Sequence, residues 1–311
     1  MATQTLVQAK LFINDEIVTG IVDDIITTNP IFQVMPFTGY AGQAILVNRE
    51  NTLGDAQNLA IGGTITAKAA STSVQTPFTA VTMIGDAEIN GLVQAQSVSA
   101  GVDQMMAEVS SKAKSVGRLI QTGMASGTGT NPQMHSYSSL CDASQFTTAS
   151  AGQALSFELL DELLDLVKAK DGEVDYLVAN GKQLIKYRTL VRALGGITET
   201  MVFTMPSGRT RNVDLYNGIP IFQNDYITSV ETANGAALAG GALTSIYAGC
   251  FDDGTQKIGQ SFIHPDGVPA GIAIEQVGVS DTKDETITRV KAYANFVNFN
   301  RRGLARLTSL S

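Results

Sequence analysis

The pattern of hydrophobic and polar residues changes its period several times along the chain. From Ser97 to Gly123 apolar residues recur every three or four positions, which predicts one amphipathic helix. We expect Ser99 to be its N-cap and Gly123 its C-terminal stop. A helix of about 22 residues, at about 1.5 Å each, is a rod about 33 Å long. On its own, this segment also fits a core helix of an ordinary α/β protein.

The residues before this rod carry no sustained period. Residues 1–42 combine short apolar pairs with two prolines, which predicts an extended arm. Residues 42–50 and 76–89 are rich in β-forming side chains, and the stretch between them is rich in Gly, Ala, Ser and Thr. This pattern predicts a long hairpin with a weakly hydrophobic tip. Because such a hairpin buries no core by itself, it needs an outside surface to pack against.

The residues after the rod predict a second, compact lobe. Residues 124–139 form a loop rich in Gly, Ser and Asn, which we expect to be the boundary between the lobes. A helix capped by Ser156 opens the second lobe. The Asn217-Gly218 pair, between two β-forming runs, is a strong hairpin signal. The remaining predicted elements are a buried strand at 174–180, a helix at 181–196, and strands at 243–254 and 271–279.

From Thr288 to Phe296, small or apolar side chains alternate with the polar residues Arg289, Lys291, Tyr293 and Asn295. Period two predicts an antiparallel strand with one covered face and one polar face. Arg289 and Lys291 lie on the polar face, and an ordinary solvated strand would explain them equally well. From Thr286 to Ser311 the chain has five cations and no acid, so one local basic surface is expected.

Composition narrows the function classes. The chain has 311 residues, 44% of them hydrophobic, so it can bury a substantial core and is expected to form two lobes or one lobe with large extensions. Its net charge of −8 argues against tight wrapping of nucleic acid, which depends on lysine and arginine. No stretch is apolar enough to suggest a signal peptide or a membrane span.

The residues that could support catalysis or metal binding lack the necessary neighbours. Cys141 and Cys250 lack the spacing of a zinc or redox motif, and we expect both to be buried thiols. His135 and His264 stand without a ligand motif, which favours surface histidines that simply titrate. The glycine-rich segment at 123–130 has no phosphate-loop lysine. The sequence therefore predicts no cofactor, no metal and no enzymatic activity.

The order of these parts resembles the major capsid proteins of tailed bacteriophages with the HK97-type fold. The segments that carry the resemblance are "VDQMMAEVSSKAKSVGRLIQTG" followed by "GTGTNPQ", then "VDYLVANGKQLIKYRTLVRALGG", "NGIPIFQNDYI", "IYAGCFDDG" and "TRVKAYANFVNFNRRGLARL". It implies an α+β chain with four regions: an N-terminal arm (1–42), an E-loop hairpin (43–88), a peripheral domain on a long spine helix (89–150 and 275–298) and an α/β axial domain (151–274 and 299–311).

This resemblance implies a structural subunit of an icosahedral phage head. Such a subunit assembles into hexamers and pentamers around double-stranded DNA, in the host bacterial cytoplasm, and ends in the virion. The expected partners are other copies of the chain, a portal, decoration proteins and DNA by proximity without sequence-specific binding. The rod begins near residue 100, leaving no room for a long scaffolding segment, so a separate scaffolding protein is implied. The alternatives are an encapsulin-like nanocompartment shell and a soluble hydrolase.

Five cations are candidate assembly contacts. Some relatives crosslink an E-loop lysine to an asparagine of a neighbour, and Lys68 lies in the E-loop region, but no motif identifies its asparagine. The four others lie near the C-terminus: Arg289, Lys291, Arg301 and Arg302. We hypothesise that this basic surface contacts acidic neighbours rather than DNA. Reversing Arg301 and Arg302 to glutamate is then expected to block assembly.

Overall fold

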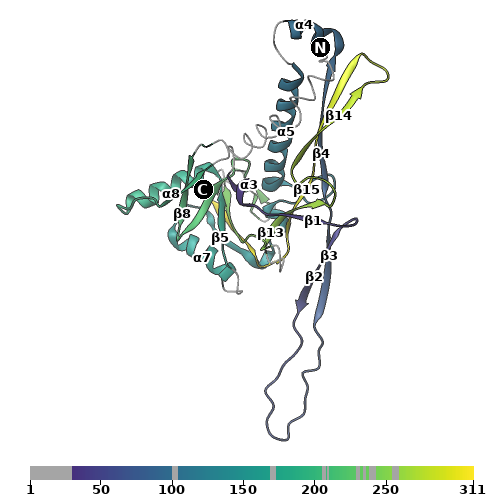
Figure 1. Cartoon of the computed structure of the whole chain (residues 1–311). Coiled ribbons are helices and arrows are strands. Elements are labelled where there is room, and N and C mark those ends of the chain that lie inside the picture. The colour runs from purple at the N-terminus through teal and green to yellow at the C-terminus, as the bar shows by residue number, and fades with distance from the viewer. Residues whose placement is uncertain are drawn as a thin grey trace.

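A computed structural model shows a compact lobe attached to an elongated spine, from which a long hairpin extends (Figure 1). The structure describes residues 30–99, 104–168, 173–204, 208, 210–228, 232–233, 236–237, 243–253 and 259–311. The predicted arm at residues 1–29 lies outside these ranges.

The predicted rod is two helices. α4 spans Gly91–Ser99 and α5 spans Gln104–Ser126. Ser99 is the last described residue of α4, so the expectation that it caps the rod is wrong. α5 also continues past Gly123, which therefore does not stop the helix. A Cβ at Gly123 would collide with the Sδ atom of Met134, so glycine serves close packing there.

One face of α5 is buried along the whole helix. Its apolar stripe packs mainly on β4 (Val81–Asn90) and β15 (Glu285–Asn298), as the helical period predicted. The buried stripe includes Met105, Val109, Ala113, Val116 and Ile120.

A five-stranded sheet forms the other half of the spine. Its path is β1-β13-β15-β14, and β4 pairs with β15 in antiparallel register. β13 spans Gln260–Pro265 and β14 spans Ile272–Val279. The predicted alternation of β15 is confirmed from Thr288 to Ala294, where Thr288, Val290, Ala292 and Ala294 are buried and the residues between them are partly exposed. From Asn295 to Asn298 every residue is buried, so the predicted polar face does not extend to the end of the strand.

The predicted long hairpin is present, with one correction. β2 (Ile45–Thr52) and β3 (Thr72–Phe78) pair antiparallel. The predicted strand at 76–89 is two strands, because the chain leaves the hairpin after Phe78 and enters the spine sheet as β4. Phe78 is buried at this break, and the amide of Ala80 donates a hydrogen bond to the Tyr40 hydroxyl at 2.9 Å.

The end of the predicted arm is ordered secondary structure. Ile31–Val34 form the short helix α3, and Phe37–Tyr40 form β1, which runs parallel to β13. The expectation of an extended arm is therefore wrong for this part of 1–42. Burial explains the difference, since the side chain of Ile31 is almost fully buried and the ring of Phe37 stacks on that of Phe262.

The compact lobe is a seven-stranded sheet covered on one face by two helices, α7 (Phe157–Lys168) and α8 (Gly181–Ala193). Its strand order is β5-β16-β12-β6-β9-β8-β7. The bounds are Phe146–Gln153 for β5, Leu304–Leu310 for β16, Thr244–Gly249 for β12, Tyr176–Ala179 for β6, Ile219–Gln223 for β9, Thr210–Tyr216 for β8 and Thr200–Thr204 for β7. The strands β10 (Thr232–Ala233) and β11 (Ala236–Ala237) form a separate pair.

Local signals in this lobe are confirmed. The amide of Leu159 donates to the Ser156 hydroxyl at 3.3 Å, so Ser156 caps α7. Asn217 and Gly218 have φ of 50° and 80° and connect β8 to β9. Positive φ at both central residues is the geometry of a type I′ hairpin turn, which asparagine and glycine tolerate.

The segment between spine and lobe packs tightly rather than hanging free. After α5 it folds back, buries Met134, and continues as α6 (Tyr137–Leu140) and the 3₁₀ turn Ala143–Gln145. The Tyr137 ring is fully buried and stacks on Tyr247 of the lobe sheet. Spine and lobe therefore share one continuous core.

A buried polar network also ties the two sheets together. The Tyr176 hydroxyl of β6 donates to Gln260 Oε1 of β13 at 2.8 Å. Gln260 Nε2 donates to Asn298 Oδ1 at 3.1 Å and to the Gly303 carbonyl at 2.9 Å. Because these groups are buried, breaking the network would leave polar atoms unsatisfied.

Candidate assembly surfaces

The hairpin tip is the least covered part of the described chain. Nearly every residue from 53 to 71 is exposed, and the segment has no regular secondary structure. Its large aliphatic side chains include Leu53, Leu59, Ile61 and Ile65, of which Leu53 is 78% exposed. Lys68 is exposed on the same segment. Four exposed large aliphatic side chains on a segment that no core covers make this tip a candidate interaction surface.

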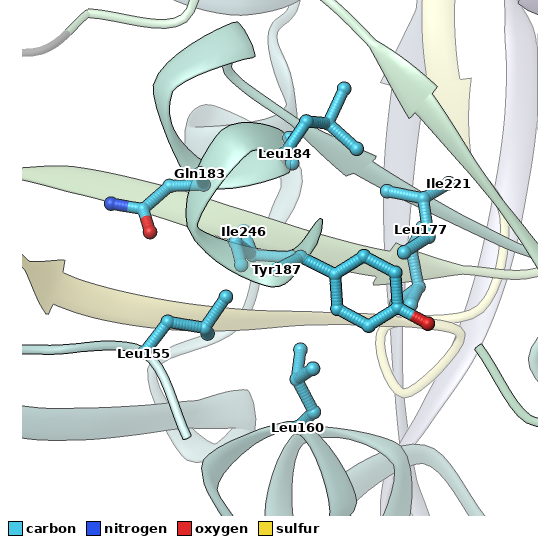
Figure 2. Close-up of a pocket in the computed structure, with 9 residues that line it drawn as sticks. Leu155, Leu160, Leu177, Gln183, Leu184, Tyr187, Ile221 and Ile246 are labelled. Atoms are coloured by element: carbon cyan, nitrogen blue, oxygen red, sulfur yellow. The ribbon is translucent and has the colours of Figure 1, made fainter. Parts of the chain in front are cut away.

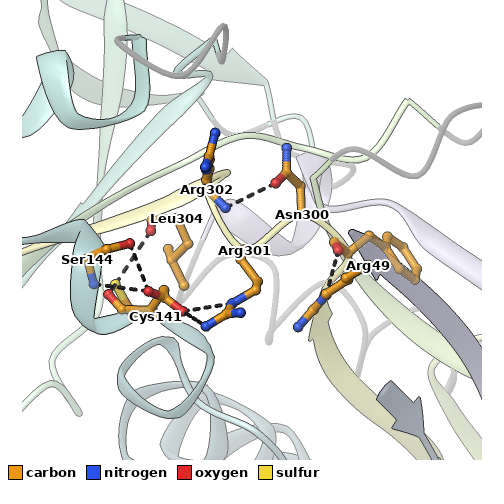
Figure 3. Close-up of polar contacts among 9 residues, drawn as sticks. Arg49, Cys141, Ser144, Asn300, Arg301, Arg302 and Leu304 are labelled. Carbon is orange, nitrogen blue, oxygen red and sulfur yellow. Dashed lines mark hydrogen bonds and ion pairs between the residues drawn. The ribbon is translucent and has the colours of Figure 1, made fainter. Parts of the chain in front are cut away.

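Arg49 fastens the base of the hairpin to the body. Its Nε donates to the Phe299 carbonyl at 3.0 Å (Figure 3). Another guanidinium nitrogen donates to the Asn298 carbonyl. The guanidinium also lies 5.5 Å from the centroid of the Phe78 ring. Burial, and then the nearby Arg301, lower the pKa of Arg49, while Asp142 opposes this effect. Sequence analysis missed this residue, whose signal was the single cation of its strand, next to Glu50.

Beside Arg49, Arg301 forms an ion pair with Asp142. Its Nε donates to Asp142 Oδ2 at 2.7 Å, and the Ser144 hydroxyl donates to Asp142 Oδ1 at 2.8 Å. Partial burial raises the pKa of Asp142, but the bonds from Ser144 and Arg301 outweigh it and hold the pKa below its usual range. Arg301 thus meets an acid of its own chain.

A polar cleft of about 260 Å³ opens between the hairpin base and the segment 139–142. Arg49 and Arg301 line it together with Asp142, Cys141 and Ser139. Burial raises the pKa of Cys141 to about 12, and the Ser139 hydroxyl donates to the Ser136 carbonyl. No histidine is among the lining residues of this cleft.

His135 packs against the same hairpin base. Its ring meets Phe78 edge-to-face with centroids 5.4 Å apart, and it is half-buried rather than on the surface as predicted. Burial lowers its pKa. Within the described residues, Nδ1 is buried without a hydrogen-bond partner. His264 lies on β13, and its Nδ1 lies 3.1 Å from the Pro265 carbonyl oxygen.

Arg289 and Lys291 lie on the face of β15 that α5 does not cover. Arg289 forms a bidentate pair with Asp86 of β4 at 2.8 Å, which lowers the pKa of Asp86 and raises that of Arg289. Lys291 pairs with Glu275 of β14, and this bond raises the pKa of the lysine. Both cations therefore neutralise acids on adjacent strands of the same sheet.

Among the four C-terminal candidates, Arg302 is available to contact another molecule. Its side chain is exposed and makes no ion pair with a described residue, while its backbone amide donates to Asn300 (Figure 3). The structure places Arg301 and Arg302 at the hairpin base, Arg289 and Lys291 on the spine, and Lys68 at the tip. Changing Arg301 to glutamate would also break its ion pair with Asp142 within the same chain. The single variant Arg302→Glu therefore tests a contact between copies without disturbing that pair.

The rest of the described chain was searched for reactive thiols, metal ligands and membrane-spanning helices. Cys141 and Cys250 are buried free thiols, as predicted, and burial raises the pKa of each to about 12. No described group of three or more His, Cys, Asp or Glu side chains is arranged to hold a metal ion. None of the described helices is both long and apolar enough to span a membrane.

Comparison with known proteins identifies the fold. No family model and no curated protein matches the sequence. Among solved structures, the holo-SrpI encapsulin complex of Synechococcus elongatus PCC 7942 matches with a TM-score of 0.68 at 13% identity, over 100% of this chain and 97% of that one. The cyanophage A-1(L) capsid matches with a TM-score of 0.65 at 10% identity, over 90% and 92%. The chain has the HK97-type capsid fold.

A third structure extends the comparison. The major capsid and decoration proteins of phage G match with a TM-score of 0.54 at 11% identity, over 90% of this chain and 89% of that one. The similarity therefore extends from the hairpin through the spine to the compact lobe, rather than covering one lobe alone. These neighbours are structural shell proteins.

Proposed function

We propose that this chain is the major capsid subunit of a tailed-phage head. The observation that carries the proposal is an HK97-type fold over the whole chain whose hairpin tip has no core of its own. Leu53 and Ile61 are exposed on this tip, and burying such side chains against neighbours is favourable at about 25 cal/mol per Å² of apolar area. Closed shells supply the neighbours that an isolated copy lacks.

The proposed mechanism is cooperative closure. Each copy contributes hairpin, spine and lobe contacts at once, so many modest contacts combine into a stable shell of hexamers and pentamers. Arg302 and Lys68 are proposed contacts with neighbouring copies, because both are exposed and lack an ion pair within the described chain. The proposed location is the virion, after assembly in the host bacterial cytoplasm with a separate scaffolding protein, a portal and decoration proteins.

The packaged material is proposed to be double-stranded DNA held by enclosure. The chain has a net charge of −8, and the basic residues of its C-terminal region are partly paired with its own acids. Tight binding of phosphate backbones needs unpaired cations, so the genome is expected to lie next to the shell without sequence-specific contact.

An encapsulin-like nanocompartment is the second candidate. It is favoured by the match to the encapsulin over the full length of this chain, at a TM-score of 0.68. The two candidates share the shell and differ in its contents, since one encloses DNA and the other a cargo protein.

Electron microscopy of the chain expressed alone and with its neighbouring genes tests both candidates. We expect closed icosahedral particles that protect DNA from added nuclease when the packaging genes are present. Particles that enclose one defined protein would instead support the nanocompartment. A chain that forms no closed particle in either expression would contradict a shell function.

A further inference from the structure

Helix α8 has an outward face that is both cationic and apolar. Lys182, Ile185 and Arg192 are exposed on one stripe of the helix, and Lys186 lies on the same stripe, partly exposed. The opposite face is directed into the lobe core, where Leu184 and Tyr187 surround a small cavity with residues of the sheet and Leu160 (Figure 2). Within one copy, one face of α8 therefore packs in the core of the lobe, and the other face is exposed.

Exposed apolar side chains continue this surface past the end of the helix. Leu194, the C-cap residue of α8, is 75% exposed, and Ile197 is 94% exposed. Several large apolar side chains beside a row of cations are typical of a protein-binding surface.

Helix α7 has the complementary character. Its outward stripe carries four acids, Glu158, Asp161, Glu162 and Asp165, and ends at one cation, Lys168, in the last turn. Carboxylates three and four residues apart repel one another, so this spacing does not serve the isolated helix. Asp161 accepts a hydrogen bond from the Tyr216 hydroxyl at 2.6 Å, whereas the other three acids form no ion pair with a described residue.

Within one copy these two charged faces do not meet. The helices touch through their inward sides, where the rings of Phe157 and Tyr187 are 6.3 Å apart. Arg188 of α8 pairs with Asp214 of β8 at 2.7 Å. Lys182, Lys186 and Arg192 form no ion pair with a described residue, so these charges remain available to another molecule.

We propose that the outward face of α8 docks on the acidic outward face of α7 in a second copy of the chain. This inference rests on the proposed function and specifies one contact within the capsomer. In the proposed ring, each copy uses α8 toward one neighbour and α7 toward the other. Such heterologous contacts generate rings when the rotation closes.

Charge complementarity favours a second copy over nucleic acid as the occupant. The acidic stripe of α7 belongs to the same lobe as α8, and the whole chain has a net charge of −8. Both features repel a phosphate backbone approaching α8. The same acidic stripe, presented by a neighbouring copy, is attracted to α8.

Charge reversal in the full chain tests the contact. One variant carries Glu162→Lys and Asp165→Lys on α7, and another carries Lys186→Glu and Arg192→Glu on α8. None of the four side chains forms an ion pair with a described residue, and circular dichroism checks that each variant folds like the wild type. We expect each variant to lower the assembled fraction at equal protein concentration at least about tenfold, because like charges then face each other.

Two rescue experiments separate this contact from a general charge effect. The chain carrying all four substitutions exchanges the signs at these four positions, so opposite charges face each other there again, and we expect it to assemble like the wild type. Mixing the two double variants also restores complementarity, but only between unlike copies. The mixture is therefore expected to form rings with an even number of subunits and no pentamers, as counted by electron microscopy and native mass spectrometry.

The outcomes are distinguishable from a failure of the proposed function. Wild-type shells together with fully assembling double variants would overturn this contact and leave the capsid function intact. Double variants that fail to assemble and are not rescued by the fourfold exchange would also overturn it. A wild-type chain that forms no particle under any of the conditions would overturn the capsid function and this contact together.

Discussion

At the residue scale, His135 shows how burial against the hairpin makes stability depend on pH. Burial lowers its pKa from the usual 6.5, because the imidazolium is poorly solvated beside Phe78. The unfolded chain therefore binds a proton that the folded chain does not. The free energy of unfolding contributed by this residue is fully present above about pH 6.5 and decreases as the pH falls through that value.

A histidine replacement tests this dependence. We expect His135→Gln to flatten the loss of unfolding free energy between pH 7.5 and 5.5, as measured by urea denaturation. Carboxylates also contribute in this range, so the reference is the wild-type slope measured in the same buffers. If the unfolding free energy of His135→Gln depends on pH as steeply as that of the wild type, His135 is not the source of the pH dependence.

At the element scale, the orientation of the hairpin depends on Arg49. The side chain crosses from β2 to the carbonyl groups of Asn298 and Phe299 at the end of β15. Asn298 and Phe299 are 249 and 250 positions from Arg49 in the chain, so only the folded structure brings them together. Hydrogen bonds from a charged donor to buried carbonyls are stronger than those between neutral groups.

Replacing Arg49 by methionine should loosen this attachment. The change keeps an apolar stem over Phe78 and removes both hydrogen bonds, so we expect a loss of about 1.5–3 kcal/mol in the free energy of unfolding. Amides of β2 and β3 should exchange hydrogen faster, as measured by mass spectrometry. Glu50→Gln on the adjacent exposed position is the control, expected to stay within about 0.5 kcal/mol of wild type. Unchanged exchange in Arg49→Met would show that other contacts hold the hairpin.

At the scale of the whole molecule, folding and assembly use different residues. The shared core of spine and lobe includes Tyr137, Tyr176 and Phe296, whereas the hairpin tip from 53 to 71 contributes nothing to it. A segment outside the core adds little to the stability of one copy. It can still be indispensable to a shell.

Shortening the tip should therefore separate the two properties. We expect a chain with residues 56–68 replaced by two glycines to keep its unfolding free energy within about 1 kcal/mol, because loop length changes closure entropy only slowly. The same chain should fail to build closed particles by electron microscopy. Lys68→Ala in the full-length tip is the matched control, and it asks whether the lysine or the loop as a whole is needed. Intact shells from the shortened chain would contradict the proposed role of the tip.

Periodicity in the sequence was enough to predict the elements that bury a regular face. The stripe of α5, the alternation of β15, the cap at Ser156 and the turn at Asn217-Gly218 depend on neighbours a few positions away, and the structure has all four. The order of elements and their resemblance to a capsid fold followed from the same local patterns.

Only the tertiary structure decided where several elements end and which charges are paired. α5 continues past Gly123 because Met134 packs there, and the strand after the hairpin breaks because Phe78 is buried. Arg289 and Arg301 were predicted as a free basic surface, yet each pairs with an acid more than 150 positions away. Helical and strand periods are short-range properties of the sequence, whereas packing and ion pairs depend on which distant residues the fold brings into contact.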